Sequence, residues 1–190
     1  MLIGLTGGIG SGKSTALDAL KQQGYKTVSC DEITRALYRR RKTLKKLRGA
    51  FPSAITGKFF LKADKKEIAR IVFSDKEKYA LLTDFLTKET YRIAMNRAKK
   101  LKGTVIVEVP LLLESGLCAD FDKVIVITRE KSARIASVKA RSALTDEEIS
   151  ARLAAQVDYD KFDLSPYTVI KNDGSEKDLA AAVLKAVKEI

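Results

Sequence analysis

The chain has 190 residues, of which 45% are hydrophobic and 32% are charged. This length suits one domain, and the composition is that of a folded chain with a buried core, which excludes a disordered or fibrous protein. Basic residues outnumber acidic residues by 36 to 24, and the net charge of +12 favours polyanionic ligands. Histidine is absent, which excludes any catalytic or metal site that needs an imidazole.

The first predicted element is a strand over Leu2–Thr6, and a glycine-rich segment follows it directly. The segment Gly7–Ser14 has the sequence G-G-I-G-S-G-K-S, which matches the G-x-x-x-x-G-K-[ST] phosphate-binding loop. Glycines let the backbone approach a phosphate, and the helix predicted over Lys13–Gln23 presents its N-terminus to the anion. We therefore expect a nucleoside triphosphate site, in which Lys13 reaches the β- and γ-phosphates and the Ser14 hydroxyl binds Mg²⁺.

The second predicted strand, Lys26–Ser29, is followed closely by an acidic and a basic side chain. Asp31 would lie at the C-terminal edge of the sheet, where ligands bind in parallel α/β folds. Its carboxylate would accept the proton of an attacking hydroxyl or hold Mg²⁺ through water, and the alternative is a helix N-cap. Arg35 follows one helical turn later on the same side, where it would bind a substrate phosphate.

Residues 33–102 contain no strand pattern like the others, and we expect them to form a helical insertion. The predicted helices there include Asp64–Phe73 and Tyr79–Leu101. No repeat or low-complexity linker marks an independent second domain. We therefore predict one domain, divided into a core (1–32, 103–128 and 157–190), the insertion (33–102) and a lid (129–156).

The run Arg39–Arg48, inside this insertion, carries seven positive charges in ten positions. One interpretation is a solvated helix face, with Leu37, Leu44 and Leu47 turned inward. The alternative is a patch that binds an anionic substrate or a nucleic acid.

The third predicted strand, Thr104–Val109, contains a glutamate near its end. Its near-continuous apolar character is typical of a strand covered on both faces, so Glu108 would be buried and would need a partner. A metal-bound water would serve at a triphosphate site, and a structural salt bridge is the alternative.

The fourth predicted strand, Lys123–Thr128, leads into a segment with several arginines. Arg129 follows the strand directly, and Arg134 and Arg141 lie in the helical stretch beyond it. Small phosphoryl-transfer enzymes use mobile, arginine-bearing lids to exclude water and to neutralise charge on the γ-phosphoryl group. The alternative for each arginine is an ordinary surface position.

The last predicted strand, Thr168–Lys171, runs into an Asn-Asp-Gly turn and a helix over Ser175–Glu189. Strand and helix patterns thus alternate along the chain, which indicates an α/β fold. We predict a three-layer phosphate-loop kinase fold with a five-stranded, mainly parallel sheet, the helical insertion and the helical lid. The guanine-reading N-K-x-D pattern is absent, so adenine is the expected base.

No part of the chain predicts a membrane span or a targeting segment. Apolar runs such as Val105–Val109 are far shorter than the roughly 20 residues of a membrane helix. Because Met1 leads directly into the strand before the phosphate loop, we expect no cleaved leader. Cys30 and Cys118 lack metal-ligand spacing, and we expect both to be small buried residues in a reducing cytoplasm.

Together these positions resemble the dephospho-coenzyme A kinase family, essentially from end to end. The resemblance rests on the phosphate loop, on the pattern Asp31-x-Ile33-x-Arg35 and on Val109–Glu114, which is close to the family's V-P-L-L-x-E. Further matching segments are Ile71–Phe73, Arg141, Arg152–Gln156 and Val169–Gly174. Their joint order and spacing is more specific than any single motif.

The resemblance implies ATP-dependent phosphorylation of the ribose 3′-hydroxyl of dephospho-coenzyme A, with Mg²⁺ as the metal ion. Asp31 would be the general base, Arg141 would act from the lid, and the basic insertion would receive the anionic acceptor. The implied nucleotide-binding residues are Gly8, Gly10, Ser11, Gly12, Lys13, Ser14, Thr15, Asn172 and Gly174. The implied acceptor-binding residues are Asp31, Arg35, Lys65, Pro110 and Leu111, while Ser14 would hold the metal and Glu108 would approach it through water.

The chain departs from the family pattern mainly at acceptor and lid positions. Ser29 stands where the family usually has the first acid of an Asp-Ala-Asp sequence, and Lys65 replaces a bidentate arginine with a point charge. The family's His-Pro pair falls at about Thr87-Lys88, and Ser137 stands where a lid arginine is expected. The nucleotide half of the site is thus intact, whereas the acceptor half is divergent.

Two other functions fit some of the same residues. One is a related small-molecule kinase that phosphorylates another nucleotide or alcohol. The other is a weakly active ATP-binding or nucleic-acid-binding protein that uses the Arg39–Arg48 run, and the joint presence of Lys13, Ser14 and Asp31 argues against it. The resemblance favours a cytoplasmic enzyme with small-molecule substrates, no obligatory nucleic acid and no membrane partner, and it leaves the oligomeric state open.

Overall fold

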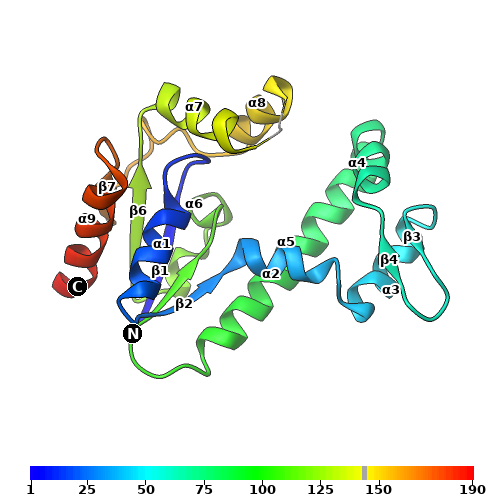
Figure 1. The fold of residues 1–190 in the computed structure, drawn as a ribbon, viewed down its shortest axis with the longest axis horizontal. Coiled ribbons are helices and arrows are strands. Elements are labelled where there is room, and N and C mark those ends of the chain that lie inside the picture. The colour runs from blue at the N-terminus through cyan, green and yellow to red at the C-terminus, as the bar shows by residue number, and fades with distance from the viewer. Residues whose placement is uncertain (143–144) are drawn as a thin grey trace. The chain divides into compact units, whose positions relative to one another are not determined.

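The computed structural model of the chain describes residues 1–142 and 145–190. The described chain divides into two compact units (Figure 1). The first unit combines Met1–Ser29 with Arg97–Ile190, and the second comprises Cys30–Asn96. Each unit has its own apolar core.

The first unit is built on a five-stranded sheet in which every neighbouring pair of strands is parallel. The strands are β1 (Leu2–Gly7), β2 (Lys26–Ser29), β5 (Val105–Glu108), β6 (Lys123–Thr128) and β7 (Thr168–Lys171). Their order across the sheet is β2-β5-β1-β6-β7, so β1 is central. The predicted five-stranded parallel sheet is confirmed, with each strand within one residue of its expected bounds.

Helices α1 (Lys13–Gln22) and α9 (Glu176–Glu189) cover one face of this sheet. Their buried side chains join those of the central strands in one core, which includes Leu20, Ile125 and Val183, each with no exposed surface. Helix α9 begins with a capping box, because the Ser175 hydroxyl accepts from the Asp178 amide while the Asp178 carboxylate accepts from the Ser175 amide. The predicted helix is therefore confirmed, with Ser175 as its N-cap.

The opposite face of the sheet packs against the segment that contains α6 (Leu112–Ser115), the short 3₁₀ helix η1 (Leu117–Asp120) and Phe121 directly after it. Gly4 in β1 makes this close approach possible. A Cβ atom there would lie 2.7 Å from a methyl group of Leu112 and 3.2 Å from the Phe121 ring. The first unit thus has the three predicted layers.

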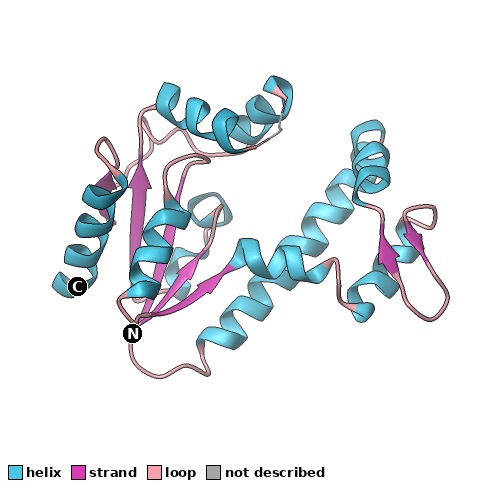
Figure 2. Ribbon diagram, viewed as in Figure 1, coloured by secondary structure: helices cyan, strands magenta, loops and turns pink. Residues whose placement is uncertain are grey.

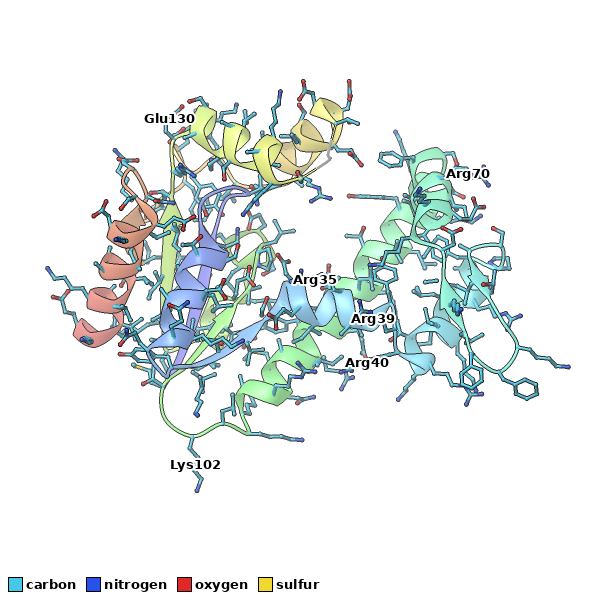
Figure 3. All side chains as sticks on the ribbon, in the orientation of Figure 1. Arg35, Arg39, Arg40, Arg70, Lys102 and Glu130 are labelled. Atoms are coloured by element: carbon cyan, nitrogen blue, oxygen red, sulfur yellow. The ribbon has the colours of Figure 1, made fainter. Side chains whose placement is uncertain are left out.

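Helices α7 (Lys131–Arg141) and α8 (Asp146–Ala154) lie at the end of the sheet toward which β6 points (Figure 1). Glu130, labelled in Figure 3, caps α7 by accepting a hydrogen bond from the Ala133 amide. A hydrogen bond from the Ser132 hydroxyl is the main reason that the pKa of Glu130 is lowered to about 2. The capping carboxylate is therefore ionised at neutral pH, which suits a helix N-terminus.

The second unit contains α2 (Cys30–Leu37), α3 (Arg41–Ala50), α4 (Lys65–Ser74) and most of α5 (Lys76–Ala98). Leu37, Leu44 and Leu47 are at most 2% exposed, which confirms that the basic run turns these leucines inward. A hydrogen bond of 2.8 Å between the hydroxyls of Thr34 and Thr90 joins α2 to α5. None of the helices that the structure describes is long and apolar enough to cross a membrane.

The insertion also contains a hairpin that the sequence pattern did not predict. Strands β3 (Ile55–Thr56) and β4 (Lys62–Ala63) pair antiparallel, as Figure 2 shows. Strands of two residues are too short to display a period of two, which explains why the sequence shows no strand pattern here.

The predicted helix ends in the insertion need correction as well. Asp64 is the N-cap of α4 rather than its first residue, because its carboxylate accepts from the amides of Lys66 and Glu67. Helix α5 begins at Lys76 instead of Tyr79, since Asp75 accepts from the Lys78 amide. That hydrogen bond also lowers the pKa of Asp75. The first residues of α5 are polar, so the spacing of apolar residues did not predict where the helix begins.

The core of the first unit predicts a clear contrast between two valines. Val183→Ala removes two methyl groups from a site with no exposed surface and is expected to lower the free energy of unfolding by about 2 kcal/mol. Val169→Ala is the matched control, because Val169 is 45% exposed and its loss is expected to cost less than about 1 kcal/mol. Urea denaturation measures both, and equal losses would contradict the proposed core.

Candidate active site

The phosphate loop connects the central strand β1 to α1, and its shape depends on glycine. Gly7, Gly10 and Gly12 have φ angles of 148°, 78° and 104°, in the region that side chains with a Cβ atom rarely adopt. These conformations turn the chain sharply after β1 and direct it into α1. Gly7, Gly10 and Gly12 are therefore required by the backbone itself.

The surroundings of the loop leave no room for side chains at these three glycines, and at Gly7 a Cβ atom would collide with the backbone carbonyl of Ile127. A Cβ atom at Gly10 would collide with the backbone carbonyl of Arg134 in α7. At Gly12 it would lie 2.6 Å from the Asn172 amide group and 2.8 Å from Leu179. The loop is thus enclosed by the lid helix on one side and by the turn after β7 on the other.

The predicted phosphate-binding side chains lie where the loop becomes a helix. The Lys13 ammonium donates to the carbonyls of Gly7 and Gly8, at 2.7 and 3.0 Å, so it lies against the loop. Ser14 is exposed in the first turn of α1, and this turn contains no acidic side chain. The helix N-terminus can therefore accept an anion without repulsion from its own side chains.

A buried asparagine holds the other end of the loop. The Asn172 side-chain amide donates to the Ser11 carbonyl at 2.8 Å, and the Asn172 backbone amide donates to Thr128 at 2.8 Å. Beside this contact is a pocket of about 650 Å³. Its lining includes Gly12, Thr15, Arg129, Arg141, Asn172 and Gly174. The structure thus brings the nucleotide-binding residues expected at both ends of the first unit into one site, of a size that suits a nucleoside.

Glu108 and Ser29 form a buried pair at neighbouring strand ends. The two residues are register partners in β5 and β2, and the Ser29 hydroxyl donates to the Glu108 carboxylate at 2.5 Å. They are 4% and 8% exposed, respectively. The serine that replaces the expected first acid is therefore a partner of Glu108, a role that neither interpretation of the glutamate included.

In the second unit, Asp31 lies in the first turn of α2 and is exposed. Because α2 begins at Cys30, the alternative that Asp31 is a helix N-cap is wrong. Arg35, labelled in Figure 3, lies one turn further along and donates through Nε to the Asp31 carbonyl at 3.3 Å. Lys65 begins α4 and holds its ammonium 5.3 Å from the centre of the Tyr38 ring.

The remaining predicted residues belong to the first unit. Pro110 and Leu111 follow β5, and Leu111 is 38% exposed where α6 begins. Arg141 ends α7, is exposed and lines the pocket. Arg134 differs from the expected mobile lid arginine, because it is only 8% exposed and its main chain lies against the phosphate loop.

Sequence reasoning missed two further residues at the loop. The Gln156 side chain accepts from the Ile9 amide at 2.9 Å, and the buried Tyr159 ring lies 5.7 Å from the guanidinium of Arg134. Gln156 belongs to a segment that matches the family pattern, but the pattern alone assigned it no role. Nothing in the sequence around Tyr159 indicated its position.

A phosphate loop after the central strand of a five-stranded parallel sheet, beside an arginine-bearing helical lid, defines a phosphate-loop kinase fold. A family model described as dephospho-CoA kinase matches residues 1–178. The chain therefore belongs to the dephospho-CoA kinase family.

Individual relatives agree with this assignment. The chain is 35% identical over 189 residues to the dephospho-CoA kinase of Thermus thermophilus, with 98% of this chain and 90% of the relative covered. It is 33% identical over 194 residues to that of Helicobacter pylori, with 99% and 96% covered. The solved structure of a dephospho-CoA kinase from Campylobacter jejuni matches with a TM-score of 0.70 at 29% identity, and the match covers 99% of this chain and 96% of that chain.

The buried asparagine provides a test of the site. Asn172→Asp replaces a donor with an oxygen that faces the Ser11 carbonyl in a position only 7% exposed. We expect ATP affinity to fall at least about tenfold, because the buried carbonyl loses its donor and a buried charge is added. Calorimetric titration with ATP measures this loss. Asn96→Asp, at an exposed position, is the control, and equal affinities for the two variants would contradict the role of Asn172.

Proposed function

We propose that this protein transfers the γ-phosphoryl group of ATP to the ribose 3′-hydroxyl of dephospho-coenzyme A, giving coenzyme A and ADP, in the cytoplasm. The observation that carries the proposal is the glycine-dependent phosphate loop, in a chain that matches the dephospho-CoA kinase family over residues 1–178. Small-molecule substrates account for the basic charge of the chain, so neither a nucleic acid nor a membrane partner is required.

The donor half of the site lies in the first unit. We infer that the loop amides surround the ATP phosphates and that Lys13 leaves the Gly7 and Gly8 carbonyls to bind the β- and γ-phosphates. The adenosine would occupy the pocket at Asn172. The proposed nucleotide-binding residues are Gly8, Gly10, Ser11, Gly12, Lys13, Ser14, Thr15, Asn172 and Gly174.

The acceptor half is proposed to use Asp31 as the general base. Its exposed carboxylate would take the proton of the 3′-hydroxyl as the oxygen attacks the γ-phosphorus, and the bond to the bridging oxygen of ADP breaks. Arg35 and Lys65 supply positive charge for the phosphates of the acceptor, while Pro110 and Leu111 supply apolar surface. We propose that Arg141, exposed at the pocket, neutralises negative charge on the transferred group.

Magnesium fits the available oxygen donors. Among the described residues no group of three His, Cys, Asp or Glu side chains could hold a metal ion. Mg²⁺ in kinases is usually bound by one or two protein groups together with substrate phosphates and waters, so such a group is not needed. Ser14 would bind the ion directly and Glu108, already hydrogen-bonded to Ser29, would act through water. The ion would neutralise charge on the β- and γ-phosphates.

The proposed reaction is tested by turnover of the purified protein. With ATP and Mg²⁺ we expect dephospho-coenzyme A to be converted to coenzyme A, detected by mass spectrometry of the product. Asp31→Asn is expected to lower kcat by about 10² to 10⁴ because the general base is lost, while ATP affinity is unchanged.

Asp18→Asn is the matched control, since Asp18 is an exposed acid in α1. It is expected to turn over like the parent protein. No product from the parent, or faster transfer to another alcohol in an acceptor panel, would contradict the proposed substrate. Full activity of Asp31→Asn would contradict only the role of Asp31.

A further inference from the structure

Arg134 is a buried charge beside the phosphate loop. Although it lies near the N-terminal end of the helix α7, it is only 8% exposed. Its Nε atom has no hydrogen-bond partner among the residues that the structure describes. A guanidinium remains charged at any physiological pH, so a nearly buried one needs compensation from its surroundings.

The guanidinium lies directly against Gly8. A Cβ atom built on Gly8 would collide with the terminal nitrogen of Arg134 and would lie 3.1 Å from its central carbon. Gly8 is not among the glycines with positive φ, so its backbone would allow an alanine. The arginine side chain therefore occupies the space that a side chain at this loop position would need.

Tyr159 lies against this arginine, and Glu114 lies close enough to Tyr159 for its charge to act on the phenol. The centre of the guanidinium lies 5.7 Å from the centre of the Tyr159 ring, within the range of a cation–π interaction. Burial is the main reason that the pKa of Tyr159 is raised, the Glu114 charge raises it further, and the Arg134 charge opposes this shift. One positive and one negative side chain thus act on the same neutral phenol.

The same cluster is tied to the segment that follows the lid. One Glu114 oxygen accepts from the Val157 amide at 2.9 Å, while the other is buried without a hydrogen-bond partner among the described residues. The neighbouring Gln156 side chain accepts from the Ile9 amide of the loop at 2.9 Å. The loop, α7 and residues 156–159 are therefore connected by polar contacts on the lid side.

We propose that Arg134 is a positioning residue for ATP: it holds the phosphate loop at Gly8 and places a permanent buried positive charge next to the triphosphate. The Tyr159 ring holds the guanidinium from the other side. This inference rests on the proposed function, because it assigns the loop a triphosphate ligand. Binding of the triphosphate supplies negative charge for this guanidinium, which the Tyr159 ring compensates only in part.

ATP titration of charge variants tests this role. Arg134→Gln is expected to weaken Mg²⁺–ATP binding about tenfold or more, with KM for dephospho-coenzyme A changed less than about twofold. Arg134→Lys, which keeps the charge without the planar fork, is expected to fall between this variant and the parent. Lys131→Gln removes an exposed charge from the same helix and is the matched control, expected to bind ATP like the parent.

A double-mutant cycle between Gly8 and Arg134 tests the contact itself. Gly8→Ala should weaken ATP binding in the parent, and the loss should be at least about threefold smaller in an Arg134→Ala background, where the space is free. Equal losses in both backgrounds would overturn the proposal, as would ATP affinity of Arg134→Gln within twofold of the parent. If Arg134→Gln does not fold, the ATP affinity of Arg134→Lys and the double-mutant cycle test the proposal instead.

These titrations do not require phosphoryl transfer. A protein that binds ATP with the expected dependence on Arg134, but does not phosphorylate dephospho-coenzyme A, would contradict the proposed function and leave the role of Arg134 supported. Weakening of both substrates to the same extent in Arg134→Gln would indicate a general structural effect and would overturn the proposed role.

Discussion

The site depends on the backbone of the chain between β1 and α1. This segment must adopt left-handed conformations, and it must do so in a space without room for Cβ atoms. Gly10 and Gly12 meet both requirements, because each has positive φ and each faces atoms closer than a side chain would permit. The lid helix α7 and the Asn172 turn can approach the loop only because of these glycines. The resulting loop leads directly into the N-terminus of α1, where the helix dipole favours an anion.

Strand order explains how distant parts of the sequence reach this loop. Because β1 is central in a parallel sheet, its C-terminal end has β5 and β6 as direct neighbours. Segments after those strands therefore emerge at the same edge, where ligands bind in such folds. Glu108 lies at the end of one neighbour, and α7 with Arg134 follows the other. Membership of the dephospho-CoA kinase family agrees with this arrangement, since phosphoryl transfer needs a bound triphosphate and charge from a lid.

Local sequence patterns predicted the sheet and the loop because strand patterning and the glycine motif are properties of adjacent residues. The same reasoning missed the hairpin at Ile55–Ala63, whose two-residue strands have no detectable period, and the helix start at Asp75, which a polar cap determines. The contacts of Arg134 with Gly8 and with the buried Tyr159 were not predictable from local patterns. Each contact joins residues more than twenty positions apart in the sequence. The sequence predicts Arg134 only as one of several lid arginines, and the packing of α7 shows that it is buried against the loop.

The central claim is that the loop with Lys13 binds the triphosphate of ATP. Its most direct test is calorimetric titration of Mg²⁺–ATP into the parent protein and into Lys13→Ala. The account predicts one ATP per parent chain and an affinity at least about tenfold lower in the variant, because a charge-assisted contact to the β- and γ-phosphates is lost. Equal affinity of the two proteins for ATP would contradict the account.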